Sequence, residues 1–460
     1  MAPSYPSPYT AVVAGLLFPL HERLKRHRSV AVRRAMEASQ HWSPARLREL
    51  QLQRLRRLLL RAHSQVPYYR ALFAELGFDP ARDLHSLADL ARLPLTDKAT
   101  IRANGEALKA ADAVGLARFN TGGSSGEPLI FHIGRERVSH DVAAKWRATR
   151  WWGVDIGDPE IVVWGSPIEL GAQDRVRALR DRVLRTTLLP AFEMSAARLD
   201  GFVAAIRARR PRMLFGYPSA LSHIARHAAA AGQRMNDLGI RVAFVTSERL
   251  YDEQRSQIGN TFGCPVANGY GGRDAGFIAH QCPAGGMHLT AEDIIVEIID
   301  AAGQPLPAGA SGEIVITHLA SGDFPFIRYR TGDIGVLDPA PCACGRGLPL
   351  LKEIQGRSTD FLVAQDGTVM HGLALVYILR DLPQVQAFKI VQESLALTRV
   401  QLVLAAPLED ALRARIEQSF RARLGAGVTV DIERVDEIAA ERSGKYRYVV
   451  SKVDAGSVPA

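Results

Sequence analysis

Cysteine is scarce in this sequence, and no hydrophobic run near its start is long enough to cross a membrane. Four cysteines in 460 residues do not make a disulfide framework, and Cys342 and Cys344 are too close together to pair. The apolar run over residues 11–20 is too short for a bilayer, follows no basic segment and lacks a small-residue cleavage site. We therefore expect a cytoplasmic protein without an export signal or a transmembrane segment.

Acidic residues are rare at the N-terminal end. Residues 1–70 contain thirteen Lys and Arg but three acids, so they account for the formal charge of +9 and leave the rest of the chain close to neutral. A nucleic-acid enzyme would spread its positive charge along a groove in its body, so we expect no nucleic-acid partner. Leucines at helical spacing over residues 43–65 predict a basic amphipathic helix packed on the main domain, with membrane-surface or carrier-protein docking as the alternatives.

The chain as a whole has the composition of a globular protein, 47% hydrophobic and 23% charged, and its 460 residues exceed what one core usually organises. Between residues 110 and 340, short β-branched runs alternate with Ala/Arg-rich helical stretches, which is the α/β pattern. The expected strands lie at 161–164, 242–245, 294–299 and 313–316, and helices at 196–209 and 219–231. Beyond Gly356, short strands, a helix over 408–424 and a strand over 428–435 predict a small α+β domain.

A glycine- and hydroxyl-rich loop is the most informative segment. It consists of Thr121, Gly122, Gly123, Ser124, Ser125 and Gly126 and precedes a strand-like run over 129–131. Its glycines let backbone amides turn inward and its hydroxyls add donors, which suits a polyphosphate. No Gly-Lys-Ser/Thr follows, so it is not a Walker loop. Taken alone, a surface turn remains an equally open interpretation.

Four further strings follow this loop in order. They are Asn-Gly-Tyr-Gly-Gly-Arg-Asp at 268–274, Tyr-Arg-Thr-Gly-Asp at 329–333, Gly-Arg-Ser-Thr-Asp at 356–360 and Ser-Gly-Lys-Tyr-Arg at 443–447. Together with the loop they resemble the signatures of the adenylate-forming enzymes, which activate a carboxylic acid as its acyl-AMP. The strings at 17–20, 66–69, 93–98, 326–333 and 342–346 narrow the resemblance to the phenylacetate-CoA ligase-like, capsular-polysaccharide-associated branch.

This resemblance implies an α/β fold with a large N-terminal adenylate-forming domain of layered β-sheets and helices and a small mobile α+β C-terminal domain. We expect a helical N-terminal arm over residues 1–110 packed on the main domain, a core over 111–356 and the C-terminal domain over 357–460. The small domain would rotate about a hinge at Asp360, as is general in the superfamily.

The resemblance also implies residue roles in ATP binding. The loop 121–126 would hold the triphosphate, because a carboxylate attacking an α-phosphate must be shielded from like charge and held in line. The other ATP-binding assignments are Tyr270 against the adenine, Asp333 on the ribose hydroxyls, Arg357 on the ribose or phosphates, and Gly271, Ser247 and Glu248 without a more specific role.

Two residues are the catalytic candidates. Asp274 takes the position of a Mg²⁺ ligand where the family usually has Glu, and its side chain is one methylene shorter, so a bridging water or a shifted backbone would be needed. Lys445 takes the position of the lysine that swings in to neutralise charge during adenylation, which suits a point charge on a flexible stem.

A possible structural Zn²⁺ site is formed by Cys282, His288, Cys342 and Cys344. Three thiols and an imidazole make a closed tetrahedral set, but the spacing is not that of a common zinc finger, so the sequence leaves the site open. Related members of the branch carry a similar set. Cys264 lies outside it and is interpreted as a buried small hydrophobe.

The substrate pocket is expected to include Phe215, Tyr217, Gly276 and Phe277, with His280 nearby in a structural role. Apolar and aromatic walls favour an aryl or medium-sized acyl acid. The predicted enzyme is an acid–thiol ligase that uses ATP and Mg²⁺, releases pyrophosphate and transfers the acyl group to coenzyme A or a phosphopantetheinyl acyl carrier protein, which the basic arm would recognise. Alternatives are acyl or adenylyl transfer in surface-polysaccharide or pigment assembly, and a degenerate nucleotide-binding homologue.

Overall fold

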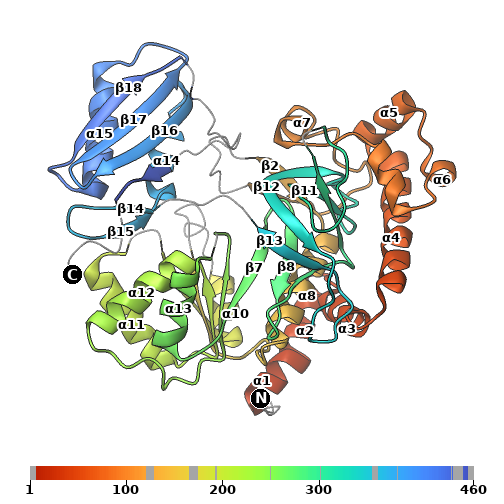
Figure 1. Ribbon diagram of the computed structural model, residues 1–460, viewed down its shortest axis with the longest axis horizontal. Helices are drawn as coiled ribbons and strands as arrows, with labels where there is room; N and C mark the ends of the chain where they lie inside the picture. Colours follow the sequence, from red (N-terminus) through yellow and green to blue (C-terminus); the bar gives the residue numbers. More distant parts are fainter. Residues whose placement is uncertain are drawn as a thin grey trace.

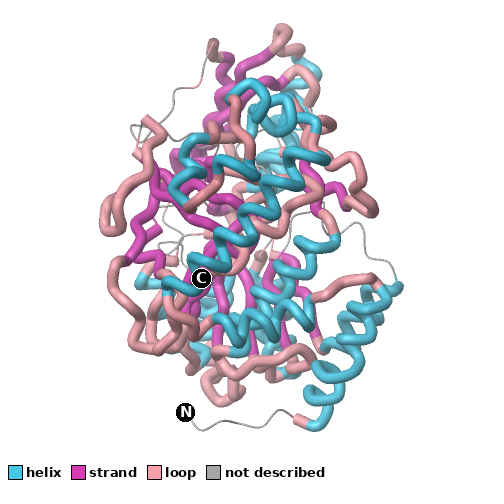
Figure 2. The backbone as a smooth tube through the Cα atoms, turned by 90° about the vertical axis from the view of Figure 1, so that its right-hand side faces the viewer, coloured by secondary structure: helices cyan, strands magenta, loops and turns pink. Residues whose placement is uncertain are grey.

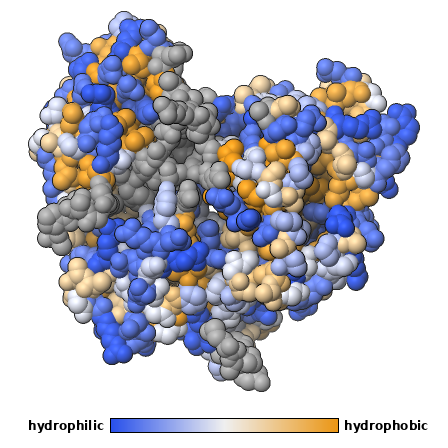
Figure 3. Space-filling view, viewed as in Figure 1, coloured by the Kyte–Doolittle hydropathy of each residue, from blue (hydrophilic) through white to orange (hydrophobic). Residues whose placement is uncertain are grey.

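The computed structural model describes most of the chain, with elements labelled in Figure 1. The described residues are 7–120, 129–164, 175–191, 194–248, 250–300, 302–354, 361–380, 382–436, 438 and 449–453. No helix among them is long and apolar enough to span a bilayer. A large sheet with its helices forms one body and a smaller sheet forms a second, and the molecular outline is notched between the two (Figure 3).

Helices alone build the described chain ahead of the first strand. They are α1 (Pro8–Val12), the π-helical turn η1 (Val13–Leu17), α2 (Phe18–Leu24), α3 (Ser29–Ser39), α4 (Pro44–Gln65), α5 (Pro67–Leu76), α6 (Pro80–Asp83), the 3₁₀ turn η2 (Leu87–Arg92) and α7 (Lys98–Ala103). The predicted basic helix is α4, which starts at a Ser43 cap and a Pro44 in the first turn. Four of its leucines, Leu47, Leu55, Leu58 and Leu59, are buried against the large sheet, as the apolar spacing predicted.

A hairpin and a long helix lead from these helices into the sheet. The antiparallel strands β1 (Ala117–Asn120) and β2 (Ile130–Ile133) flank the expected phosphate loop, and α8 (Arg135–Arg150) follows. The strand predicted after that loop is therefore confirmed.

The main sheet has eleven strands in the order β10-β11-β12-β13-β9-β8-β7-β6-β5-β3-β4. Its parallel half contains β3 (Glu160–Trp164), β4 (Thr186–Pro190), β5 (Met213–Gly216), β6 (Val242–Thr246) and β7 (Val266–Gly272). Among the described residues, four helices alternate with these strands: α10 (Arg175–Leu184), α11 (Ala196–Arg209), α12 (Pro218–Ala230) and α13 (Asp252–Phe262). Strands that are buried on both faces read as continuous apolar runs, which is why β6 was visible in the sequence, whereas β5, equally buried, was not predicted.

The antiparallel half of the sheet follows along the chain. It comprises β8 (Gly276–Gln281), β9 (Met287–Leu289), β10 (Ile294–Ile299), β11 (Ser311–His318), β12 (Tyr329–Asp338) and β13 (Leu350–Ile354). Buried side chains from this half pack with α4, α5 and the β1–β2 hairpin in one hydrophobic core. In the side view, the N-terminal helices lie across the front of these strands (Figure 2).

The smaller body has its own core and sheet. Strands β18 (Thr429–Arg434), β17 (Leu397–Leu404), β16 (Val385–Ser394) and β19 (Val449–Ser451) form a four-stranded sheet in that order. The hairpin β14 (Phe361–Val363) and β15 (Val369–His371) and the helices α14 (Leu373–Arg380) and α15 (Asp410–Leu424) accompany it. The predicted α+β character and the helix over 408–424 are confirmed.

A buried ionic network joins the N-terminal helices to the large domain. Arg147 of α8 pairs with Glu292 at 2.6 Å, with both side chains 1% exposed, and Ser39 of α3 donates a hydrogen bond to the same carboxylate at 2.7 Å. Beside this pair, Asp293 accepts hydrogen bonds from Arg54 of α4 and from His140 of α8, both at 2.7 Å. Burial alone would raise the pKa of Asp293, but the His140 and Arg54 contacts hold it down at about 2.

We expect Arg147→Ala to destabilise the large domain by about 3–5 kcal/mol, because Glu292 would remain buried without its partner. All five tryptophans of the sequence lie between residues 42 and 164, so urea unfolding followed by tryptophan fluorescence reports on this domain alone. Arg150→Ala is the control, since Arg150 is 39% exposed and its ion pairs should contribute less than about 1 kcal/mol. Equal losses in the two variants would contradict the network's importance.

Candidate nucleotide and acyl site

Two of the motif segments meet through a pair of reciprocal tyrosine–carboxylate hydrogen bonds. The Tyr270 hydroxyl, on β7, donates to Asp333 of β12 at 3.0 Å. The Tyr329 hydroxyl, on β12, donates to Asp274, just beyond β7, at 2.7 Å. Strands β8, β9 and β13 separate β7 from β12 in the sheet order, so the antiparallel half curls back on itself to bring these residues together. Both strings thus contribute one aromatic and one acidic residue to a single site.

The backbone around Asp333 is fixed by its neighbours on β12. Thr331 Oγ1 accepts the Asp333 N–H at 3.1 Å and donates to the Ile314 carbonyl of β11 at 2.8 Å. Gly332 between them has a φ of +77°, a conformation that L side chains rarely adopt. The local structure therefore explains the Thr-Gly-Asp sequence, because this turn directs the Asp333 carboxylate toward Tyr270.

Asp274 is held by a buried arginine that the sequence analysis did not single out. Arg137 of α8 donates to the carbonyl oxygens of Arg273 and Asp274 at 2.8 and 2.6 Å. Burial lowers the pKa of Arg137, while the neighbouring carboxylates of Asp141 and Asp274 act in the opposite direction. The Asp274 carboxylate also accepts the Ala275 N–H at 3.1 Å. Only the basic composition of α8 hinted at this role.

The turn that presents Asp274 has no room for larger residues. A Cβ at Gly271 would lie 2.2 Å from the carbonyl oxygen of Gly276 across the β7–β8 hairpin. Gly276 has a φ of +80°, and a Cβ there would lie 2.8 Å from the ring of His318. These glycines therefore allow the close backbone approach that sets the position of the acid.

Ser247 and Glu248 lie at the carboxyl end of β6 in the parallel half of the sheet. Ser247 has a φ of +73°, which is unusual for a residue with a side chain, and Ser219 of α12 donates a hydrogen bond to the Glu248 carboxylate. Ligands of open parallel sheets bind at this edge. The strained backbone at Ser247 is consistent with the ATP-binding role that the resemblance implies for this residue. Nothing in the sequence pattern indicated the strain itself.

Aromatic side chains gather at the same ends of β3 and β5. Trp164 stacks on Tyr217 at 4.4 Å and on Phe215 at 5.9 Å between ring centroids. The Lys145 ammonium of α8 lies 4.0 Å from the Phe215 ring centroid and pairs with Glu160 at 3.2 Å. The predicted Phe215 and Tyr217 therefore share one aromatic cluster with Trp164, which the sequence analysis placed in a strand but not in the pocket.

His280 is connected to these rings through Phe244, whose ring centroid lies 6.1 Å from that of Phe215. Its ring stacks on Phe277 at 5.5 Å and meets Phe244 edge-on at 5.8 Å. Burial, helped by the positive charges of Arg147 and Lys145, lowers the pKa of His280 to about 3, so this imidazole is neutral. Its Nδ1 has no hydrogen-bond partner within the described part of the chain.

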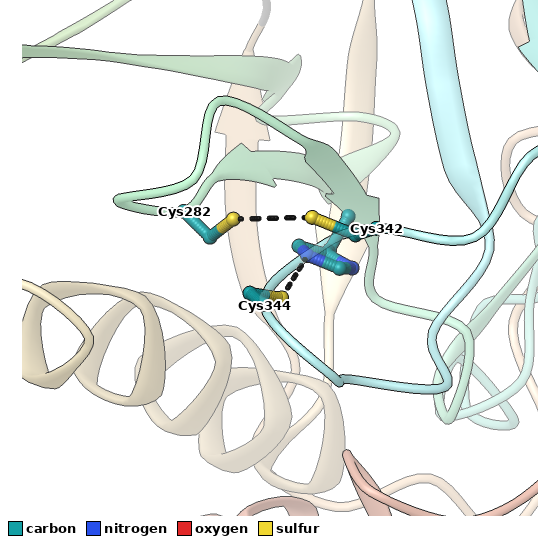
Figure 4. Close-up of side chains that lie close together, drawn as sticks. Cys282, Cys342 and Cys344 are labelled. Carbon is teal, nitrogen blue, oxygen red and sulfur yellow. Dashed lines mark hydrogen bonds between the residues drawn. The ribbon is translucent and has the colours of Figure 1, made fainter.

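The three predicted cysteines come together beyond the end of β8 that is farther from Asp274 (Figure 4). His288 belongs to the same group. The sulfurs of Cys282 and Cys342 are 3.6 Å apart, and His288 Nε2 is 3.1 Å from the sulfur of Cys344. All four donor atoms lie within 4.8 Å of one another. His288 Nδ1 faces the Leu348 carbonyl at 3.3 Å, which directs Nε2 to the thiols. Three thiols and one imidazole fit a tetrahedral zinc site.

Cys264 is 7% exposed and is not part of the cluster, as expected for a small buried hydrophobe. Several predicted site residues lie outside the described residues: the loop residues Thr121, Gly122, Gly123, Ser124, Ser125 and Gly126, the predicted ribose or phosphate contact Arg357, the predicted hinge residue Asp360 and the predicted adenylation lysine Lys445. Their assignments stay predictions.

The chain matches two family models. Residues 186–320 match the AMP-binding enzyme model, and residues 362–452 match the CapK C-terminal domain. The phenylacetate-coenzyme A ligase of Pseudomonas putida is 30% identical over 324 residues, which cover 69% of this chain and 72% of that protein. The phenylacetate-coenzyme A ligase of Thermus thermophilus is 27% identical over 74% of this chain and 76% of its own.

Solved structures agree with this fold. The 2-hydroxyisobutyryl-CoA ligase, in complex with 2-HIB-AMP and CoA in its thioesterification state, aligns with a TM-score of 0.65 at 22% identity over 91% of this chain and 92% of that one. Its postadenylation state aligns with a TM-score of 0.59. At this level of identity the likeness establishes the architecture, a large α/β domain followed by a small C-terminal domain.

Removing the hydroxyl of Tyr329 should weaken the large domain by about 1.5–3 kcal/mol, because the hydrogen bond that it makes is to a charged acceptor. Tyr329→Phe is measured by urea unfolding with tryptophan fluorescence. The same substitution in an Asp274→Ala background is the matched control and should cost much less. Equal costs in both backgrounds would show that the Tyr329–Asp274 contact does not contribute.

Proposed function

The chain belongs to the adenylate-forming acid–thiol ligases of the phenylacetate-CoA ligase type, and from this membership we propose that it activates an aryl or related carboxylic acid with ATP and transfers the acyl group to a thiol. The substrate carboxylate oxygen attacks the α-phosphorus of ATP, the bond to pyrophosphate breaks, and the acyl-AMP forms. The thiol sulfur then attacks the acyl carbon and AMP leaves.

The pairing of Tyr270 with Asp333 and of Tyr329 with Asp274 is the observation that carries this proposal. It brings an aromatic face suited to stacking on adenine next to a carboxylate suited to accepting ribose hydroxyls. The second carboxylate, Asp274, is half-buried beside them. An ATP site needs these three features close together, and two distant segments of the chain supply them.

Asp274 is the residue that would hold Mg²⁺, because a carboxylate is the hard oxygen ligand that this cation prefers. Bound Mg²⁺ would neutralise phosphate charge as pyrophosphate leaves. Asp274 donates no proton in this scheme. Its hydrogen bond from Tyr329 and the Arg137 contacts to the backbone fix the carboxylate in advance.

The aromatic walls support an aryl or similarly apolar acid. Trp164, Phe215 and Tyr217 offer stacked rings on one side, and Phe277 with His280 offers another pair of stacked rings. A neutral His280 can donate or accept one hydrogen bond, so a polar substituent on the acid would find a partner there.

The thiol is coenzyme A or the phosphopantetheine of an acyl carrier protein. The basic N-terminal helices suit an acidic carrier, but Arg54 is already bound to Asp293 and Arg56 donates to the Leu84 carbonyl at 2.7 Å. Arg48 and Arg57 of α4 are exposed and are the cations that a carrier would meet. The match to a CapK-type C-terminal domain keeps transfer in surface-polysaccharide assembly as the second candidate function.

We expect acid-dependent pyrophosphate release with ATP and Mg²⁺, tested over benzoates, hydroxybenzoates, phenylacetates and fatty acids with coenzyme A or carrier protein as acceptor. Lys445→Ala should reduce the rate of pyrophosphate release at least about 100-fold. The reason is that this lysine neutralises negative charge in the transition state of adenylation. Lys452→Ala is the control within the same domain, since Lys452 is 58% exposed and pairs with Glu393. Full activity of Lys445→Ala would remove its catalytic role, and release without any added acid would contradict the proposed reaction.

The cluster of Cys282, His288, Cys342 and Cys344 is proposed to hold a structural Zn²⁺, because a closed set of four protein ligands leaves no position for substrate. We expect one zinc per chain by elemental analysis, lost in Cys342→Ser together with part of the stability of the large domain. Cys264→Ala should keep its metal, because Cys264 is outside the cluster. A wild-type protein purified without chelators that contains no zinc would refute the assignment.

A further inference from the structure

An unusual share of the exposed hydrophobic surface belongs to the first helices. Among the described residues, twelve large hydrophobic side chains are exposed, and six of them lie in α1, η1 and α2: Tyr9, Val12, Leu16, Leu17, Leu20 and Leu24. A seventh, Leu179, is on α10, which touches this segment where the Tyr9 hydroxyl donates to the Val183 carbonyl at 2.8 Å. Contiguous apolar surface of this kind marks an interaction site.

The helical segment shows two opposite faces. Thr10, Val13, Phe18 and Glu22 are buried and fasten it to the body, where Thr10 donates to Asp158 at 2.8 Å and Phe18 packs edge-on against Trp146. Successive buried residues are three apart from Thr10 to Val13 but five apart from Val13 to Phe18. The longer step falls at the π-helical turn Val13–Leu17, because a π-helical turn contains one more residue than an α-helical turn. This turn keeps the anchored face continuous and leaves the exposed hydrophobic residues together on the other.

Positive charge borders this apolar face. Arg23, Lys25, Arg26 and Arg28 follow one another at the end of α2 and are exposed. The one acid of residues 1–34, Glu22, is 4% exposed and is engaged by Ser29 and His27. The surface therefore combines a row of leucines with cations and offers no exposed carboxylate in this stretch.

We propose that this face binds the surface of an anionic lipid bilayer, with the helix lying in the interfacial plane. A row of leucines beside clustered Lys and Arg is the pattern of interfacial amphipathic helices, in which the leucines enter the acyl boundary and the cations meet phosphate headgroups. A second copy of the chain could cover the leucines, but it would add four more cations and no exposed carboxylate from residues 1–34, which disfavours a symmetric dimer through this face. An acidic carrier protein would satisfy the cations but leave the leucines exposed.

The test is flotation of the full-length protein with vesicles of phosphatidylcholine alone and of phosphatidylcholine mixed with phosphatidylglycerol. We expect binding to the mixed vesicles only, weakened by salt because the attraction is partly electrostatic. Leu16→Ser with Leu20→Ser should lower the partition constant on the order of 100-fold, since two leucines no longer enter the bilayer. Arg23→Ala with Lys25→Ala should lower it about 30-fold.

Matched controls are Val114→Ser, which removes a hydrophobic side chain that is 71% exposed elsewhere, and Arg48→Ala with Arg57→Ala on α4. Both should bind vesicles like the wild type, and circular dichroism checks that all variants are folded. Absence of wild-type binding to the mixed vesicles overturns the proposal. A wild-type dimer that becomes monomeric in the Leu16→Ser, Leu20→Ser variant also overturns it, because a second copy would then cover this face.

Discussion

The two hydrogen bonds between tyrosine and aspartate hold the candidate active site together. Tyr270 with Asp333 and Tyr329 with Asp274 link β7 to β12, two strands that are not neighbours in the sheet. Each bond places a charged acceptor opposite a hydroxyl donor in a partly buried setting, where such bonds are stronger than between neutral groups. A longer contact, from the Tyr270 hydroxyl to Thr331 Oγ1 at 3.5 Å, crosses the site beside them.

The cysteine–histidine cluster lies beyond the ends of β8 and β12 that are farther from the site. Cys282 follows β8, whose first residues adjoin Asp274, and Cys342 and Cys344 follow β12, which begins with Tyr329. The antiparallel half is therefore held by hydrogen bonds at the site, and the proposed Zn²⁺ would hold it again at the cluster. The buried Arg147–Glu292 and Asp293 contacts add the N-terminal helices to this unit, so the site rests on a rigid support.

The sequence predicted what depends on local pattern. Strands such as β6 and β10 are continuous apolar runs, and α11 and α15 follow helical spacing closely, so their positions were visible. The pairing of Tyr329 with Asp274 was not, because it depends on how the sheet curls, and no periodic pattern encodes that curl. Arg137 and Arg147 were missed for a related reason, since a buried arginine on a helix reads as a solvated one until its partner is known. The π-helical turn was hidden because it shifts the apolar spacing by one residue.

The central claim is that the strings at 268–274 and 329–333 form one nucleotide site. The most direct measurement is a crystal structure of the protein with ATP and Mg²⁺ or with an acyl-AMP. The account predicts that the adenine lies against the Tyr270 ring, that the ribose hydroxyls bond to Asp333, and that Asp274 faces the phosphates. A nucleotide bound elsewhere, with Tyr270 and Asp333 untouched, would contradict it.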